Sequence, residues 1–166
     1  ALNCANACGI LADFLEDETL LPTVSGRMSS GGFGFEIDTA SGRQHIEVSN
    51  SQIEIDAAYE GARALSLFEA KRDLSDDFLI RQLYYPFRVW SGRVAKPVKT
   101  VFLIFSNGIF HLYQYQFDDP LYYNSLRLVK QKNYVIATDI CRSDIEQILK
   151  TVPVGQEPEL SFPQAN

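Results

Sequence analysis

The segment LSLFEAKRD, residues 65–73, joins an apolar run to a charged end. Side chains two positions apart in a strand project from the same face. Glu69 and Lys71 therefore lie together at the end of a strand that otherwise reads as buried. Two interpretations are open at this point. The two residues form a structural ion pair, or they belong to a chemical site that draws further residues from elsewhere in the chain.

The composition is that of an ordinary globular domain. The chain has 166 residues, of which 46% are hydrophobic and 22% charged, which is enough to build one sizeable core. No apolar run approaches the roughly 20 residues that span a bilayer, so we expect no membrane association. The first residues lack a basic leader, and Asp13 interrupts their apolar patch, so we expect no signal peptide. We assign residues 1–152 to a single domain and 153–166 to a C-terminal tail containing Pro and Gln.

The charges are unevenly distributed. The net charge of −6 argues weakly against a nucleic-acid binder, but residues 1–60 hold ten acids and two bases, and the remainder is slightly basic. Residues 81–99 contain no acid and five bases, which are Arg81, Arg88, Arg93, Lys96 and Lys99. A local positive strip can bind a polyanion on an acidic protein. A solvated helix face explains the same pattern equally well.

The three cysteines indicate a reducing compartment. The chain has an odd and small number of cysteines, namely Cys4, Cys8 and Cys141. We therefore expect no disulfide framework, and we expect a cytoplasmic location. With two histidines in the chain, no zinc set of usual spacing exists. We expect buried structural thiols.

Hydrophobic periodicity predicts an α/β order of elements. A helix is expected at 4–16, a Gly/Ser-rich loop at 25–34, and strands at 33–38, 44–49, 52–59 and 65–71. The loop has no GK[ST] and no helical pattern after it, so a nucleotide-binding loop is rejected.

The second half of the chain continues this alternation. A helix capped by Ser75 should kink or end near Tyr85, before Pro86. Strands at 98–105 and 109–117 flank an Asn-Gly hairpin turn, one or two strands follow in 122–137, and a last short helix begins at Ser143. This order predicts a mixed sheet with helices on its faces.

A hairpin between the strands at 52–59 and 65–71 would place Asp56 across from Glu69 and Lys71. Two neighbouring carboxylates repel each other unless something neutralises them. Mg²⁺ prefers oxygen ligands and is often held by one or two carboxylates, so it is the natural neutraliser, with the Ala70 carbonyl as a further ligand. Lys71 would orient or help deprotonate a water, or stabilise charge on a phosphorus oxygen.

These residues also carry a family resemblance. The pattern D-x(12)-E-A-K on two successive strands, between two helices, resembles the PD-(D/E)xK nuclease superfamily from the first helix through the strands at 98–117. Ile55 stands where the family often has proline. The following R-Q-L-Y-Y-P-F-R, residues 81–88, is similar to a Q-L-x-Y-P-x-R helix of restriction-endonuclease-like proteins, with Gln82 at the position of a glutamine close to the metal.

The resemblance implies a restriction endonuclease-like three-layer α/β fold, with a central mixed β-sheet flanked by helices. It further implies a Mg²⁺-dependent DNA endonuclease, a restriction endonuclease or its catalytic domain, in which Mn²⁺ can replace Mg²⁺. Asp56, Glu69 and the Ala70 carbonyl would hold the metal, Lys71 would poise the water, and Gln82 would support the site. The expected partner is double-stranded DNA, and a homodimer would cut both strands.

Several other residues are weighed against plainer explanations. Arg81, Arg88, Arg93, Lys96 and Lys99 are candidate phosphate contacts, and Arg127, Lys130 and Lys132 form a second basic group. Glu54, Asp13 and Glu16 are candidates for an extra metal ligand, although exposed acids are the commoner case. His111 is expected to be a satisfied strand histidine.

Two rival functions remain open. One is a nuclease-like module that serves in DNA binding or assembly without catalysis, and the other is an unrelated α/β domain in which Glu69 and Lys71 form an ion pair. DNA or RNA as substrate, and any recognition sequence, also stay open.

Overall fold

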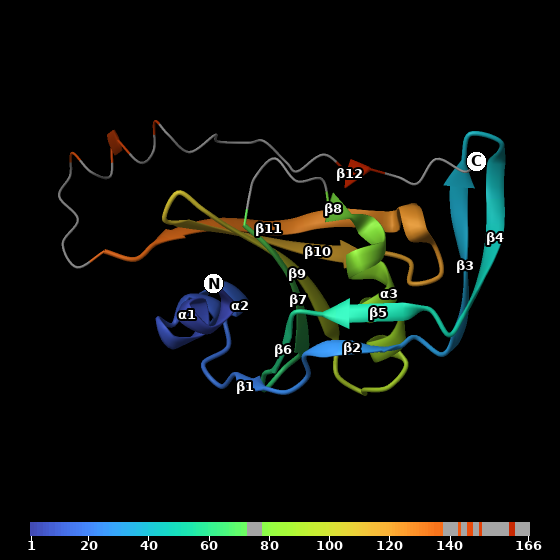
Figure 1. Ribbon diagram of the computed structural model, residues 1–166, viewed down its shortest axis with the longest axis horizontal. Coiled ribbons are helices and arrows are strands. Elements are labelled where there is room, and N and C mark those ends of the chain that lie inside the picture. Colours follow the sequence, from blue (N-terminus) through green and yellow to red (C-terminus); the bar gives the residue numbers. More distant parts are fainter. Residues whose placement is uncertain (73–77, 138–142, 144–145, 148–149, 151–159, 162–166) are drawn as a thin grey trace.

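The structure is a computed structural model that describes residues 1–72, 78–137, 143, 146–147, 150 and 160–161. Its centre is a six-stranded sheet in the order β1-β6-β7-β9-β10-β11. The strands are β1 Leu21–Pro22, β6 Ala57–Glu60, β7 Leu65–Lys71, β9 Val98–Ser106, β10 Ile109–Phe117 and β11 Leu126–Val135 (Figure 1). Only the pair β7–β9 is parallel among these neighbours. The predicted mixed α/β architecture is therefore confirmed, with more strand than helix.

Strand β7 lies in the interior of this sheet, between β6 and β9. A parallel pair needs a long crossover connection, and helix α3, Ile80–Ser91, lies in the segment that connects β7 to β9. The apolar part of the segment 65–73 thus belongs to a central strand, in which residues 65–69 are all buried.

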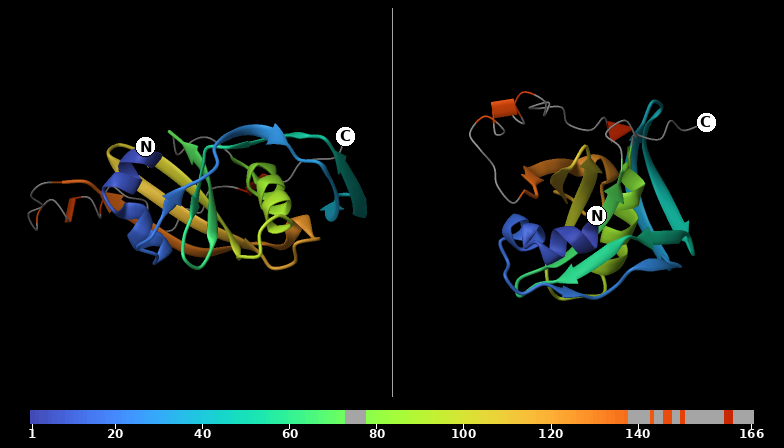
Figure 2. Two further views of the ribbon diagram at one scale, coloured as in Figure 1. Left: turned by 90° about the horizontal axis from the view of Figure 1, so that it is seen from below. Right: turned by 60° about the vertical axis from the view of Figure 1, so that its left-hand side comes forward.

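Helices cover both faces of the sheet. Because side chains alternate along a strand, Val101 and Leu103 of β9 face helices α1 (Leu2–Ala7) and α2 (Ile10–Leu15). Phe102 and Ile104 face α3 on the opposite side. Figure 2 shows the two short helices and α3 separated by the strands.

The predicted helix at 4–16 is wrong as one element. Gly9 adopts φ +74, which separates α1 from α2, and glycine reaches this left-handed conformation without steric strain. The break leaves α1 with Ala5 as its buried residue. Cys4 and Cys8 are exposed free thiols, so the prediction of buried thiols is wrong for these two, and Cys141 lies outside the described residues.

Of the two predicted outcomes at Pro86, a kink or an end of the helix, the end is wrong. The helix continues through Pro86 to Ser91. Proline removes the N–H that would bond the Gln82 carbonyl, but Leu83 and Phe87 on either side of it are packed into the core and hold the helix against the sheet. The predicted cap at Ser75 lies outside the described residues.

The segment 25–34, predicted as a loop, contains strand structure. Strand β2, Gly26–Ser29, pairs with β5, Gln52–Ile55, and β3, Gly32–Thr39, forms a hairpin with β4, Gly42–Ser49. Strand β2 forms because it pairs with β5, more than twenty residues away in the sequence. The local Gly/Ser content does not reveal this pairing. The β3–β4 hairpin packs Phe35 and Val48 against α3.

The predicted β9–β10 hairpin is confirmed. Asn107 and Gly108 both have positive φ, 52° and 77°, as a tight two-residue turn requires. After β10 comes a short 3₁₀ helix η1, Tyr123–Ser125, and then β11.

The described part of the C-terminal region adds one short strand. Strand β8, Phe78–Leu79, pairs in parallel with β12, Leu160–Ser161, inside the segment predicted as a tail. The apolar positions of the predicted last helix, Ile145, Ile148 and Leu149, lie outside the described residues.

Candidate functional site

Asp56 lies at the corner between the two-stranded β2–β5 sheet and the central six-stranded sheet. The strand predicted at 52–59 is divided at this residue, with β5 before it paired to β2 and β6 after it paired to β7. The register Ala57↔Phe68 brings Asp56 beside Glu69, as the predicted hairpin requires. The Asp56 Oδ2 atom accepts a hydrogen bond from the Ala70 N–H at 2.8 Å.

This contact places a carboxylate where a backbone carbonyl would otherwise continue the ladder. The chain turns away at Asp56, so its side chain takes over the pairing with Ala70. The N–H and C=O of one strand residue leave the strand on the same side. The Ala70 carbonyl therefore points toward the same edge as Asp56, as the predicted ligand set needs.

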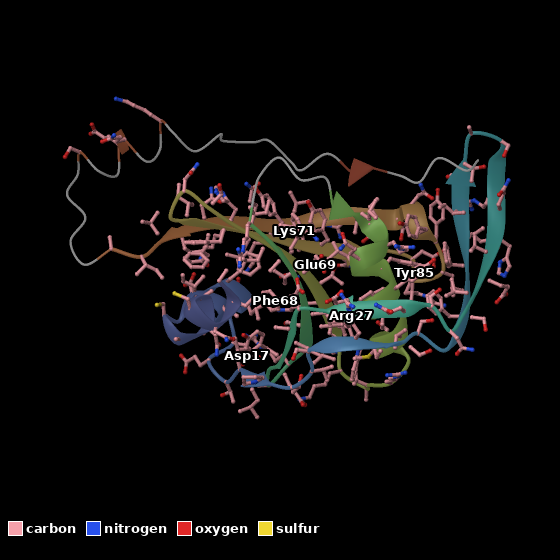
Figure 3. The ribbon with its side chains drawn as sticks, in the orientation of Figure 1. Asp17, Arg27, Phe68, Glu69, Lys71 and Tyr85 are labelled. Atoms are coloured by element: carbon pink, nitrogen blue, oxygen red, sulfur yellow. The ribbon has the colours of Figure 1, made fainter. Side chains whose placement is uncertain are left out.

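Glu69 ends the buried part of β7 and is held by two donors. The Gln82 Nε2 atom donates to Glu69 Oε1 at 2.8 Å, and Lys71 Nζ lies 2.8 Å from the same oxygen. Because both contacts use Oε1, a cation bound through Oε2 need not displace either of them. The Glu69 side chain is only 7% exposed and that of Lys71 27%. Figure 3 labels both side chains at β7.

Gln82 is itself fixed by the start of α3. Its Oε1 atom accepts a hydrogen bond from the Leu79 N–H at 3.3 Å, one of the amide groups that a helix leaves without an intrahelical partner. The same side chain thus connects the first turn of α3 to the end of β7. This bridge orients Glu69 from outside the sheet.

The environment of Glu69 disfavours its charge. Burial raises the pKa of the Glu69 carboxyl, and repulsion from Asp56 and Glu54 raises it further, although Lys71 acts in the opposite direction. A carboxylate that remains destabilised despite a neighbouring lysine is a group that a further cation would stabilise.

These groups line one pocket of about 410 Å³ at the end of β7. Its polar wall comes from β5, the Asp56 corner and β7, and its other wall from α3. Residues on the two walls include Glu54, Asp56, Glu69, Lys71, Gln82 and Tyr85. The pocket therefore gathers the four predicted catalytic side chains from three separate parts of the chain.

Glu54 also faces this pocket, and Arg27 lies beside it. The two residues are register partners on β5 and β2, and Arg27 Nε is 3.2 Å from Glu54 Oε2. Both are exposed. Arg27 is a residue that sequence reasoning missed, because the strand that carries it was taken for a loop.

The donor set suits a magnesium ion. Within the described residues, no three His, Cys, Asp or Glu side chains are grouped as metal ligands. Mg²⁺ is usually held by one or two carboxylates, and it keeps several waters. Asp56, Glu69 and the Ala70 carbonyl supply oxygen donors of that kind.

Of the five bases between residues 81 and 99, Arg81 lines the pocket and is exposed. Arg88 is half-buried, donates from Nη2 to the Gly34 carbonyl at 3.1 Å, and lies over Phe33. The contacts of Arg88 are thus those of a residue that holds α3 to the β3–β4 hairpin.

The other three bases lie near the opposite end of the sheet. Lys99 is in register with Ser66, three residues or roughly 10 Å along β7 from Glu69, and it donates to the Leu15 carbonyl. Lys96 pairs with Glu60 at 2.6 Å, and Arg93 lies over the Trp90 ring. The predicted positive strip is thus divided, with Arg81 at the pocket and these three elsewhere.

The remaining candidates lie on the α2 side of the sheet. Asp13 contacts Lys132 at 2.7 Å and Tyr134 at 2.6 Å, and Glu16 contacts Lys130. The two acids are thus bound to β11 and not gathered at the pocket, and they neutralise two members of the second basic group. Its third member, Arg127, pairs with Asp118 at 3.0 Å.

His111 behaves as a strand histidine. It is buried, its Nδ1 lies 2.9 Å from Asn133 Oδ1, and burial lowers its pKa. The expectation of a satisfied strand histidine agrees with this environment.

Comparison with known protein families identifies the family of this chain. Residues 1–135 match the family described as Domain of unknown function (DUF6997). No curated protein and no solved structure matches the chain. Within the described residues, no helix is both long enough and apolar enough to cross a bilayer.

Proposed function

We propose that the chain, which belongs to the DUF6997 family, is a Mg²⁺-dependent DNA endonuclease of the PD-(D/E)xK superfamily. One observation carries the proposal. Asp56, Glu69, Lys71 and Gln82 converge on a single pocket, with Glu69 contacted directly by Lys71 and Gln82. A structural ion pair needs Glu69 and Lys71 alone, and it gives no reason for Asp56 and Gln82 to lie in the same pocket.

The layer arrangement supports a restriction endonuclease-like fold. A mixed sheet lies between α1 and α2 on one face and α3 on the other, and the site lies at the end of its central strand β7. In that fold, the acidic residues and the lysine belong to adjoining strands; here Glu69 and Lys71 belong to β7, and Asp56 directly precedes the adjoining strand β6.

Asp56, Glu69 and the Ala70 carbonyl would hold the metal. A bound Mg²⁺, or Mn²⁺ in its place, supplies charge neutralisation at the phosphate and a water that is acidic enough to react near neutral pH. Asp56 would also position the Ala70 carbonyl, because its carboxylate accepts a hydrogen bond from the Ala70 N–H.

Lys71 and Gln82 act on either side of Glu69. The Lys71 ammonium lies at the pocket wall, where it would orient the attacking water and stabilise negative charge that develops on a phosphate oxygen. Gln82 would hold the Glu69 carboxylate in one orientation, and its own amide is fixed by the Leu79 N–H.

DNA would approach past Arg81, which is exposed on the same wall. Arginine makes bidentate contacts to phosphate oxygens, so this position suits the strand on which the cut is made. Double-stranded DNA is the proposed substrate, and two copies of the chain would be needed for a cut in both strands. A restriction endonuclease, or the catalytic domain of one, is the setting we propose.

The test is cleavage of plasmid and oligonucleotide DNA in Mg²⁺ by the wild type, by Asp56→Asn and by Lys71→Ala. Lys132→Ala is the matched control, because it removes a lysine that also pairs with an acid but lies away from the pocket. We expect the first two variants to lose activity by about 10²–10⁴-fold and the control to retain it. Equal activity in all four proteins would overturn the assigned site, and absence of cleavage by the wild type with DNA binding retained would favour a non-catalytic binding module.

A further inference from the structure

A second pocket adjoins the candidate site along α3. It measures about 350 Å³ and is formed between the β3–β4 hairpin, the start of α3 and η1. Its lining is largely apolar and aromatic, with Phe35, Ile37, Ile46, Leu79 and Tyr123 among the residues that form it. This volume falls in the range of pockets that bind small ligands.

The two pockets share a wall. Arg81 and Tyr85 line both of them, and they lie four residues apart on α3, so they project from the same face of the helix. The Arg81 guanidinium lies 5.9 Å from the centre of the Tyr85 ring. A molecule that occupied both pockets would therefore pass a cation and an aromatic ring on its way from one to the other.

The aromatic side of this pocket is held by its own packing. The Phe35 ring stacks on Tyr123 at 5.5 Å and meets Tyr85 edge-on at 6.1 Å, while Phe33 meets Tyr85 edge-on at 5.2 Å. Aromatic pairs in such geometry stabilise each other beyond the area that they bury. The rings thus form a wall that exists before a ligand arrives.

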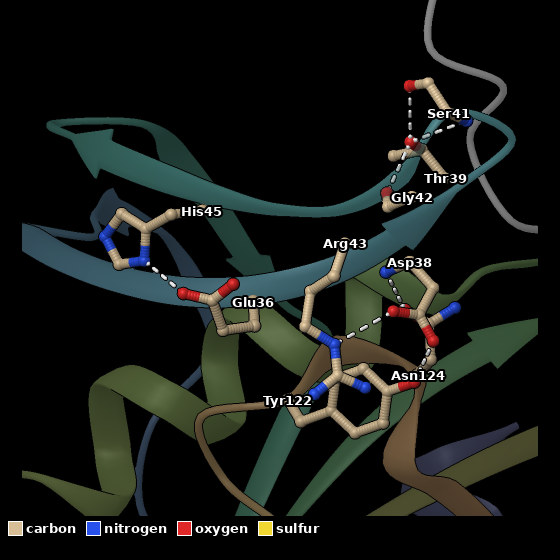
Figure 4. Close-up of polar contacts among 9 residues, drawn as sticks. All are labelled: Glu36, Asp38, Thr39, Ser41, Gly42, Arg43, His45, Tyr122 and Asn124. Carbon is tan, nitrogen blue, oxygen red and sulfur yellow. Dashed lines mark hydrogen bonds and ion pairs between the residues drawn. The ribbon is translucent and has the colours of Figure 1, made fainter.

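Polar contacts fix the hairpin to the segment that leads into β11. The Asp38 N–H donates to Asn124 Oδ1 at 2.8 Å, the Asp38 carboxylate pairs with Arg43 at 3.0 Å, and Tyr122 donates to the same carboxylate (Figure 4). These contacts tie the far end of the pocket to the body of the domain. The pocket is therefore built from rigid parts on three sides.

The chemistry of the two pockets differs sharply. One presents carboxylates, a lysine and a glutamine, and the other presents aromatic rings and aliphatic side chains. With Mg²⁺ bound as proposed, the carboxylate pocket would accept an anionic group, so an occupant of both pockets would join such a group to a flat, weakly polar one. A nucleotide has both parts, because its phosphate would lie at the carboxylate pocket while its base inserts among the rings.

We propose that the apolar pocket receives an unstacked nucleobase next to the scissile phosphate. The inference rests on the proposed nuclease function and specifies its substrate. A base leaves a perfect duplex only if its pairing and stacking are given up, and the loss is smallest at a mismatch or in a single strand. The enzyme should accordingly prefer DNA with an unpaired base at this position over a fully paired duplex.

The test uses 2-aminopurine, which becomes fluorescent when it unstacks, placed in turn at each position flanking the cut in a DNA duplex. Lys71→Ala protein serves as the binding-only background, so that unstacking is read without cleavage. Ile46→Glu and Leu79→Glu each place a charge in the pocket, and Leu79 is 45% exposed, so its substitution is compatible with folding. Val129→Glu on β11, at a residue 43% exposed, is the control.

We expect fluorescence to rise severalfold at one position, and this rise to be lost in both pocket variants but kept in the control. In the wild-type protein, a mismatch at that position should accelerate cleavage by about tenfold relative to the fully paired duplex. No rise at any position, or a rise that persists in both pocket variants, would overturn the inference. Cleavage of perfect duplex by the wild type would then still stand, so failure of the base pocket is separable from failure of the nuclease proposal.

Discussion

Two acid–lysine pairs on opposite faces of the sheet have almost the same geometry and opposite electrostatics. Glu69 and Lys71 lie 2.8 Å apart at the pocket, and Asp13 and Lys132 lie 2.7 Å apart between α2 and β11. Lys132 and a hydrogen bond from Tyr134 lower the pKa of Asp13. Burial raises the pKa of Glu69, and Lys71 does not reverse the shift.

The difference lies in exposure and in the neighbouring charges. The Asp13 side chain is 58% exposed and that of Lys132 49%, so water solvates both and the pair is a surface contact. Glu69 is buried and has Asp56 and Glu54 near it. An isolated acid–lysine contact therefore says little about function, whereas a buried carboxylate among other carboxylates is one that a cation would stabilise.

The largest expected contrast is in DNA cleavage by the two matched acid variants. Glu69→Gln should lose about 10²-fold or more in cleavage rate, because the amide has no charge to hold the metal. Asp13→Asn should cleave within about twofold of the wild type, since the pair that it breaks is an exposed contact away from the pocket. The measurement is the rate of plasmid linearisation under saturating Mg²⁺.

Thermal unfolding serves as the control for this comparison. If Glu69→Gln lost cleavage only because it unfolded, its transition would fall below that of Asp13→Asn. Removal of the charge from a buried, repelled carboxylate should instead leave the Glu69→Gln protein at least as stable as the wild type in metal-free buffer. Similar cleavage rates in the two variants would remove the functional distinction between the two faces.

Substitution of Gln82 tests how Glu69 is oriented in the pocket, with a smaller expected effect than substitution of Glu69 itself. Gln82→Ala should weaken Mg²⁺ binding by about 10–100-fold, because residues that orient metal ligands typically have effects of that size. Calorimetric titration with Mg²⁺ measures this directly, without DNA. Gln82→Met keeps the bulk of the side chain and removes both of its hydrogen bonds, so it should resemble Gln82→Ala.

A wild-type affinity in Gln82→Met would assign Gln82 to packing alone. The corresponding change on the other face, Tyr134→Phe, removes a hydrogen bond to Asp13 and should leave Mg²⁺ affinity unaltered. Together the variants separate orientation of Glu69 from general loss of packing.

The sequence predicted the centre of the site better than its surroundings. The alternation in residues 65–71 and the short turn before them make a β6–β7 hairpin the simplest arrangement, and that register places Asp56 beside Glu69. Gln82 followed from resemblance alone, and its contact with Glu69 at 2.8 Å agrees with it. Local pattern sufficed for this hairpin, whose two strands are joined by a short turn.

Long-range pairing limited the remaining predictions. Strand β2 is recognisable only from its pairing with β5, so Arg27 and its contact with Glu54 were not foreseen. A basic strip between residues 81 and 99 looked continuous in sequence, yet Arg81 and Lys99 lie near opposite ends of a helix–strand unit and meet different groups. The apolar pocket needs the β3–β4 hairpin folded over α3, which no local pattern encodes.

Acid titration gives the smallest expected effect and the most direct measure of the electrostatic difference. Lys71→Met should raise the pKa of Glu69 further above its ordinary value, since Lys71 is the group that opposes burial. Lys132→Met should raise the pKa of Asp13 toward its ordinary range, because Lys132 is a group that lowers it. Carboxyl ¹³C NMR across a pH series follows both groups.

The two substitutions should also differ in the pH range over which they affect stability. The lowered pKa of Asp13 stabilises the fold above its unfolded value near 3.9, and this contribution is lost as pH falls through the folded pKa. The stability gap between wild type and Lys132→Met should thus close below about pH 3.9. Glu69 titrates in the folded state above its unfolded value near 4.3, so the gap for Lys71→Met should begin to close at higher pH. If both gaps closed over one common pH range, the two faces would be electrostatically alike and the case for a cation site at Glu69 would lose its basis.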